Sequence, residues 1–132
     1  MKYLLDTHVW VWAFTSQMGK LGPATKAILE SGDSELYLSA VTSWELSIKW
    51  ALRRLEIAGR PDQLVSQSLR DNRLTPLAVS HEQAWLVGDL PPHHHDPFDR
   101  LLVAQAIHER LILITCDQAI RAYPVTLQWA LD

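Results

Sequence analysis

Short apolar runs that alternate with helical patterns are the feature of this sequence that most constrains its fold. Strands of a parallel sheet are buried on both faces and joined by helices, so they form continuous apolar runs between helical segments. We therefore predict one α/β domain over residues 1–132, with a mainly parallel central sheet between two layers of helices. The predicted strands cover residues 3–5, 36–38, 77–79, 111–115 and 125–127.

The charge balance limits how this chain can engage nucleic acid. It has 12 basic and 15 acidic residues, a formal net charge of −3. This balance argues against a domain that coats nucleic acid through a large basic surface. It is compatible with an enzyme that acts on nucleic acid through bound metal ions, because clustered carboxylates raise the acidic total.

Other compositional features predict the compartment. The single cysteine, Cys116, excludes an internal disulfide framework and a multi-cysteine zinc site. No apolar run approaches the roughly 20 residues needed to cross a bilayer, and Asp6 follows Met1 too closely for the core of a signal peptide. We therefore expect a soluble cytoplasmic protein without a membrane segment.

Two helices can be predicted in detail. In the first, apolar residues recur at spacings of three, four and seven, which predicts one buried face with Glu45 at its edge. Lys49 and Arg53 follow Glu45 at successive i,i+4 steps, where they can pair with acids or guide RNA. The predicted apolar face comprises Val41, Trp44, Ile48, Ala51, Leu52 and Leu55.

The second helix begins at a clear capping signal. Asp96 is a typical N-cap and Pro97 suits the first helical position. Residues 98–107 are apolar nearly all round, which predicts burial. Asp99 lies in the first turn, where it can complete the cap or face a site.

Four acids are predicted to meet at one edge of the sheet. Asp6 follows the first strand and Asp117 follows the fourth, while Glu45 and Asp99 lie early in helices. Right-handed crossovers place all four at the carboxyl edge, where open α/β sheets bind their ligands. Each acid alone has a structural explanation, as a helix cap, a turn residue or a partner of Lys49. Four at one edge favour a functional site.

Converging carboxylates repel one another unless a cation joins them. Ligands that offer only oxygen suit hard cations such as Mg²⁺ or Mn²⁺. Such a cation can activate water and stabilise charge on a phosphoryl group. The pattern therefore predicts metal-assisted cleavage of a phosphodiester bond.

Four segments in order, with a terminal Trp129-Ala130, resemble the PIN domain family, and within it the VapC-type toxins of bacterial toxin–antitoxin pairs. They are residues 4–10 (LLDTHVW), 38–46 (LSAVTSWEL), 90–100 (LPPHHHDPFDR) and 113–117 (LITCD). The resemblance covers nearly the whole chain. It implies a PIN fold, an Mg²⁺-dependent endoribonuclease activity, an RNA substrate and a small cognate antitoxin.

The resemblance also implies roles for individual residues. Asp6, Glu45, Asp99 and Asp117 would surround one or two metal ions, with Asp6 and Asp99 the best matches to direct ligands. Thr115 matches a small hydroxyl residue that orients a carboxylate or a water.

The chain departs from the family pattern at three positions. His95 stands where relatives often have a basic residue, and Cys116 and Gln118 flank the fourth acid where a charged residue is more usual. These departures bear on substrate preference, because none removes a carboxylate.

Several assignments stay open at this point. Lys49, Arg53 and Arg100 are candidates to contact RNA, although solvated ion pairs explain them equally well. The histidines at 93–95 are expected to form a solvated loop at the site mouth rather than to bind metal. Surplus apolar residues at 9–12 and at Trp50 predict a homodimer and a groove for an antitoxin segment.

The sequence disfavours three other functions. A catalytically silent PIN-type binding module conflicts with the intact set of four acids. A receiver-like phosphoacceptor domain needs adjacent acids after the first strand and a lysine after a late strand, and neither is present. A phosphatase with an Asp-x-Asp motif is disfavoured because His8 occupies the second acidic position.

Overall fold

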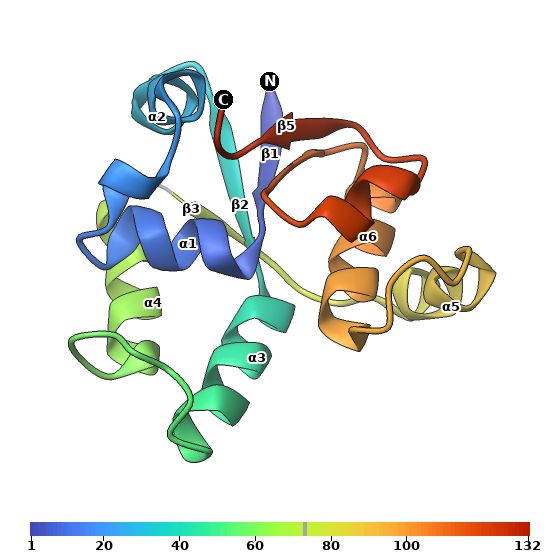
Figure 1. The fold of residues 1–132 in the computed structure, drawn as a ribbon, viewed down its shortest axis with the longest axis horizontal. Coiled ribbons are helices and arrows are strands. Elements are labelled where there is room, and N and C mark those ends of the chain that lie inside the picture. Colours follow the sequence, from blue (N-terminus) through green and yellow to red (C-terminus); the bar gives the residue numbers. More distant parts are fainter. Residues whose placement is uncertain (73) are drawn as a thin grey trace.

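The computed structural model describes residues 1–72 and 74–132 and has three layers, helix, sheet and helix (Figure 1). Within these residues, five strands form one sheet in the order β3-β2-β1-β4-β5, and every neighbouring pair is parallel. The predicted α/β class with a parallel sheet is confirmed. The receiver-like alternative was wrong, because doubly wound sheets of that kind have the order 2-1-3-4-5.

The strands are short and the helices run between them. The strands are β1 (Lys2–Leu5), β2 (Glu35–Ser39), β3 (Leu74–Leu77), β4 (Ile112–Thr115) and β5 (Leu127–Trp129). The helices are α1 (Thr7–Phe14), α2 (Pro23–Glu30), α3 (Ala40–Ala51), α4 (Pro61–Asp71), α5 (His81–Asp89) and α6 (Pro97–Glu109), with short 3-10 helices η1 (Met18–Lys20) and η2 (Gln118–Ala122).

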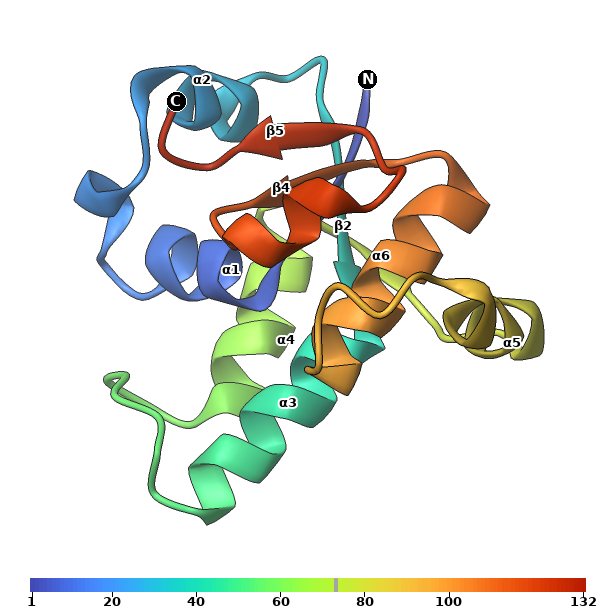
Figure 2. The ribbon, with the colours of Figure 1, turned by 45° about the vertical axis from the view of Figure 1, so that its right-hand side comes forward.

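The sheet separates two hydrophobic cores. Successive side chains of a strand point to opposite faces, so β1 sends Tyr3 and Leu5 to one core and Leu4 to the other. Helices α1, α2 and α4 cover the first face and α5 and α6 the second, as both ribbon views show (Figures 1 and 2). Trp10 is fully buried in the first core, where its Nε1 donates to Ser68 Oγ at 3.0 Å.

Both edge strands were predicted at shifted positions. The predicted β3 begins too late in the sequence and the predicted β5 begins too early. The run at 77–79 was expected to be a strand, but β3 pairs with β2 through residues 74–77. This strand includes Pro76, which an edge strand tolerates because one side of its backbone has no strand neighbour. The run at 125–127 overlaps β5 only at Leu127, because polar Gln128 interrupts the apolar pattern.

The predicted apolar face of α3 was also wrong. Trp44 and Leu52 are 54% and 57% exposed, and the helix ends at Ala51. The buried side is partly polar because it faces the carboxyl edge of the sheet, where Thr42 Oγ1 hydrogen-bonds Thr7 Oγ1 at 3.0 Å. The buried residues of α3 are Val41, Thr42, Glu45 and Leu46.

The apolar surplus predicted at residues 9–12 is largely absorbed by the fold. Val9 and Trp10 are fully buried, and Val11 and Trp12 pack partly buried against the first core. Exposed apolar surface lies instead on α3 and α5, at Trp44, Trp50 and Trp85. Among the described residues, no helix is long and apolar enough to cross a membrane.

Candidate active site

Asp6 is held at the carboxyl end of β1 by the neighbouring strand β4. It occupies the N-cap position of α1, but its side chain makes no capping hydrogen bond. Its Oδ2 instead accepts a hydrogen bond from Thr115 Oγ1 at 2.6 Å, and the residue is only 2% exposed. The Asp6 carboxylate is therefore oriented by Thr115 and does not cap the helix.

Glu45 projects from α3 into the same region. The helix begins at Ser39, whose Oγ accepts from the backbone N–H of Val41 at 3.0 Å. Glu45 is 4% exposed, and its Oε2 lies 2.7 Å from Lys49 Nζ. Its Oε1 is the one buried side-chain nitrogen or oxygen in the described parts of the chain without a hydrogen-bond partner. A buried oxygen in this state is costly and calls for a ligand.

Asp99 and Asp117 complete the set from the other side of the sheet. The Asp96 carboxylate caps α6 by accepting from the N–H groups of Phe98 and Asp99, at 2.8 and 3.3 Å. That confirms Asp96 as a cap and leaves the Asp99 carboxylate free to face the site. Asp117 follows β4, and its Oδ1 caps η2 by accepting from Ala119 N–H at 2.9 Å.

The pKa shifts reflect this convergence. Burial, together with the negative charges of Asp6, Asp96, Glu45 and Asp117, raises the pKa of Asp99 to about 8. Burial also raises the pKa of Asp6, against the hydrogen bond from Thr115. The four acids predicted from the sequence thus act on one another electrostatically.

Asp117 differs from the other acids. Burial raises its pKa, but hydrogen bonds from His94 and from Ala119 N–H outweigh that effect, so the pKa of Asp117 is lowered overall. Its side chain is 33% exposed, more than those of the other three acids.

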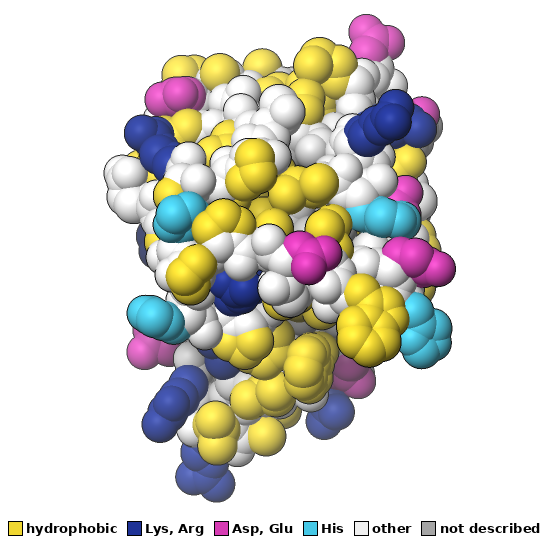
Figure 3. Space-filling model, turned by 90° about the vertical axis from the view of Figure 1, so that its right-hand side faces the viewer, with side chains coloured by type: hydrophobic (Ala, Val, Ile, Leu, Met, Phe, Trp, Pro, Cys, Tyr) yellow, Lys and Arg dark blue, Asp and Glu magenta, His cyan; other side chains and the backbone are white. Residues whose placement is uncertain are grey.

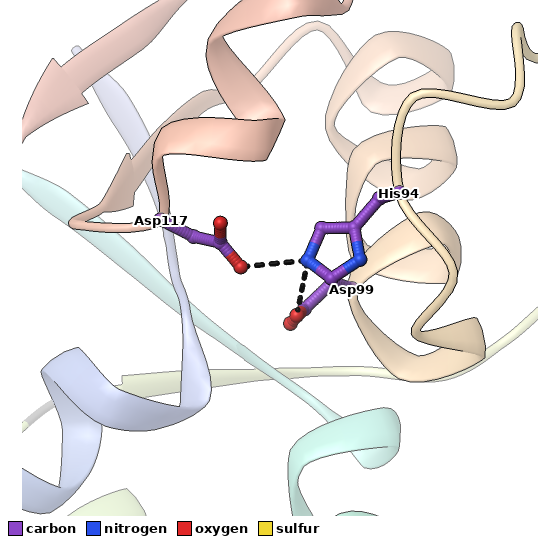
Figure 4. Close-up of side chains that lie close together, drawn as sticks. All are labelled: His94, Asp99 and Asp117. Atoms are coloured by element: carbon purple, nitrogen blue, oxygen red, sulfur yellow. Dashed lines mark hydrogen bonds and ion pairs between the residues drawn. The ribbon is translucent and has the colours of Figure 1, made fainter.

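His94 is a site residue that sequence reasoning missed. Its Nε2 lies 2.6 Å from Asp117 Oδ2 and 3.1 Å from Asp99 Oδ2 (Figure 4). The side chain is 15% exposed, so the expectation of a wholly solvated histidine loop was wrong for this residue, while His93 and His95 are exposed. Its place two residues before the N-cap of the acid-bearing helix was the available signal.

The candidate RNA contacts occupy three different settings. Lys49 is paired with Glu45, and Arg53 is exposed just beyond α3, with a φ of 55°. The Arg100 guanidinium donates to Tyr123 Oη and to the carbonyl oxygens of Val87, Leu90 and Pro91. Arg100 therefore ties the preceding loop to α6, and its terminal nitrogens are engaged within the chain.

The donor set fits a divalent cation. Carboxylates from four elements converge, their charges raise the pKa of Asp99, and Glu45 offers an unpartnered oxygen. Oxygen donors of this kind suit Mg²⁺ or Mn²⁺. One ligand atom each from His94, Asp99 and Asp117 also lies within 4.8 Å of the others.

A groove on the other side of α3 carries the exposed Trp50. It has a volume of about 610 Å³ and lies between α3 and α4. It is next to the site because Leu46, which follows Glu45 in the sequence, forms part of its wall. Its walls are Ser43, Leu46, Ser47, Trp50, Arg60, Pro61, Asp62, Val65, Ser66 and Leu69.

Comparisons with known proteins agree with this architecture. The PIN domain family model matches residues 3–125. Ribonuclease VapC22 of Mycobacterium tuberculosis is 30% identical over 131 residues, covering 94% of this chain and 96% of that protein. VapBC2 from Rickettsia felis, in a crystal structure bound to a DNA fragment from their promoter, matches with a TM-score of 0.72 and 18% identity over 97% of this chain and 98% of that chain. A toxin–antitoxin complex from Klebsiella pneumoniae matches with a TM-score of 0.65 and 19% identity over 97% of both chains.

Proposed function

The chain belongs to the PIN domain family, and from this premise we propose that it is an Mg²⁺-dependent endoribonuclease and the toxin of a toxin–antitoxin pair. The observation that carries the proposal is the convergence of Asp6, Glu45, Asp99 and Asp117, whose charges and burial raise the pKa of Asp99 to about 8. The similarity to a protein named as a ribonuclease, and to toxin–antitoxin complexes, supports the substrate and the partner. The cytoplasm is the compartment that we propose.

We assign the metal to the oxygen donors. Asp6 and Asp99 would hold it directly, and Glu45 and Asp117 directly or through water. When bound, Mg²⁺ or Mn²⁺ supplies an activated water and stabilises charge on the phosphoryl oxygens. Thr115 keeps the Asp6 carboxylate oriented, and Lys49 occupies one oxygen of Glu45 so that Oε1 alone faces inward.

RNA would approach along the exposed end of α3. Lys49 and Arg53 remain our candidates for phosphate contacts, since both lie on or beside the helix that carries Glu45. Arg100 leaves this set because its guanidinium is engaged by backbone carbonyls and Tyr123. Specificity for one RNA would depend on shape and loop contacts around the site.

RNA cleavage by the purified protein tests the proposed endoribonuclease activity. The chain, freed of any antitoxin, is expected to cleave structured RNA with Mg²⁺ or Mn²⁺ and to stop in EDTA. Asp6→Asn and Asp99→Asn should each remove most cleavage and keep the circular dichroism spectrum, while the exposed Asp33→Asn control stays active. Equal cleavage in EDTA, with contaminating nuclease excluded, contradicts metal dependence. A wild-type chain that cleaves no RNA favours the silent binding module.

We assign the α3–α4 groove to a short antitoxin segment. Its apolar walls around Leu46, Trp50 and Val65 suit an apolar side-chain row, and it shares α3 with the active site. A segment seated there can extend to the acids, where a basic side chain would form charge-assisted hydrogen bonds and compete with metal. Co-expression with a small protein encoded next to this one tests this assignment, because a bound antitoxin should block RNA cleavage.

A homodimer is proposed for the remaining apolar surface. Trp85 on α5 is 79% exposed, more than the other tryptophans with exposed side chains. In the view onto α5 and α6, hydrophobic side chains gather toward the lower end of the molecule, where Figure 1 places α3 (Figure 3). Light scattering at tens of micromolar chain tests the assembly, and a strict monomer contradicts it.

A further inference from the structure

We propose that His94 is a positioning residue of this site, which donates its Nε2–H to Asp117 beside Asp99 and does not bind the metal. Its role in RNA cleavage rests on the proposed function, whereas the tautomer of its neutral ring follows from hydrogen bonding alone.

The tautomer of His94 follows from its second ring nitrogen. The backbone N–H of Asp96 donates to His94 Nδ1 at 3.0 Å. A ring nitrogen that accepts a hydrogen bond carries no proton, so the neutral ring has its proton on Nε2. Nε2 is therefore the donor to Asp117 Oδ2 at 2.6 Å, and Asp99 Oδ2 lies 3.1 Å from the same nitrogen.

This tautomer is the wrong one for a metal ligand. A histidine that binds metal through Nε2 donates its Nδ1–H to a carboxylate, a carbonyl or water. Here Nδ1 faces a donor, and the donor is the backbone of the residue whose carboxylate caps α6. Binding through Nε2 would require an anionic ring or a broken bond at the helix cap. His94, Asp99 and Asp117 therefore lie close together without forming a three-ligand metal site.

The ring is held in place from behind. The backbone N–H of His94 donates to Tyr123 Oη at 2.9 Å, and Arg100 donates to the same oxygen at 3.1 Å. Tyr123 is 4% exposed and belongs to the second core. The loop that carries His94 is thus anchored to α6 and to the core, which gives the ring a defined position over the acids.

The fixed His94 ring restricts the orientation of the Asp117 carboxylate. Its Oδ1 accepts from Ala119 N–H and its Oδ2 from His94 Nε2, so both oxygens have defined donors. Without His94 the half-exposed carboxylate would keep only its capping bond and would be free to rotate. Partners that orient the groups around a metal typically contribute tenfold or more to activity. We expect removal of His94 to lower kcat and to leave the KM for RNA nearly unchanged.

Histidine NMR tests the tautomer directly. Long-range ¹H–¹⁵N spectra of histidine-labelled protein, with His94 assigned through His94→Gln, are expected to show a protonated Nε2 and a bare Nδ1. The pattern should be the same without metal and with saturating Mg²⁺. A switch to the Nδ1–H tautomer when Mg²⁺ is added would identify a metal ligand and overturn the proposal.

Two substitutions test positioning. Glutamine is expected to restore function because it keeps an N–H donor at the end of a side chain of similar length. His94→Ala should lower kcat by about tenfold or more, and His94→Gln should stay within about threefold of wild type. The exposed His81→Ala serves as the control. Equal loss in both His94 variants, or no loss in either, overturns the positioning role. A wild-type chain that cleaves no RNA overturns the proposed function together with this role, while the NMR result still decides the tautomer.

Discussion

Replacing Asp99 by asparagine is expected to stabilise the metal-free protein, although it removes a metal ligand. Burial and the surrounding acids raise the pKa of Asp99 from 3.8 to about 8 in the folded chain. A carboxyl group with a raised folded-state pKa takes up a proton on folding at intermediate pH, so its ionisation opposes folding above pH 3.8. Asparagine has the same shape and no charge, which removes that cost.

The size of the effect follows from the pKa shift. Each pKa unit corresponds to about 1.4 kcal/mol of differential interaction. Below pH 8 Asp99 is mostly protonated in the folded chain, and taking up that proton on folding costs up to about 4 kcal/mol at pH 7 and up to about 2 kcal/mol at pH 5. The side chain is only 15% exposed, so solvent screens this cost weakly. The advantage of Asp99→Asn over wild type should shrink by about 2 to 3 kcal/mol from pH 7 to pH 5.

Urea unfolding in EDTA at the two pH values measures this difference, with Asp33→Asn as an exposed control. In saturating Mg²⁺ the wild type should recover most of the gap, because metal binds the folded chain and neutralises the acids. If Asp99→Asn is no more stable than wild type at pH 7 in EDTA, the acids do not repel one another as inferred. A gap that does not change with pH would assign the effect to packing instead of charge.

Three further outcomes are expected. Millimolar Mg²⁺ should raise the thermal midpoint of the wild type, and of Asp6→Asn by less; a midpoint insensitive to Mg²⁺ contradicts a pre-formed site. Thr115→Val removes the hydroxyl that donates to Asp6 and should lower RNA cleavage about tenfold with little change in midpoint; unchanged cleavage would remove Thr115 from the site. Trp50→Glu places a charge in the α3–α4 groove and should release co-expressed antitoxin while RNA cleavage persists; retained antitoxin, with the exposed Val79→Glu as the surface control, would place the partner elsewhere.

The sheet could be predicted because its central strands carry their own signal. Residues 3–5 and 111–114 are continuous apolar runs, as strands covered on both faces must be. The edge strands β3 and β5 contain Pro76 and Gln128, and their pairing depends on a neighbour rather than on their own pattern. Sequence periodicity therefore located the centre of the fold better than its margins.

The acids could be predicted because strand ends and helix starts fix their edge of the sheet. The buried face of α3 could not, since the site needs polar residues there, and Trp44 stays in solvent beside the buried Glu45. His94 could not either, because its place depends on Tyr123, which is 29 residues further along the chain. Contacts of that range leave no trace in local spacing.

The hydrogen bond between Thr115 and Asp6 joins residues 109 positions apart in the chain, across neighbouring strands β1 and β4. During synthesis on the ribosome β1 is made before β4, so the hydroxyl that orients Asp6 follows it by 109 residues. A chain interrupted before Ile112 lacks Thr115 and Asp117 and has one edge of β1 without its neighbour. The order of the strands thus makes the arrangement of the Asp6 carboxylate depend on a segment synthesised much later than Asp6 itself.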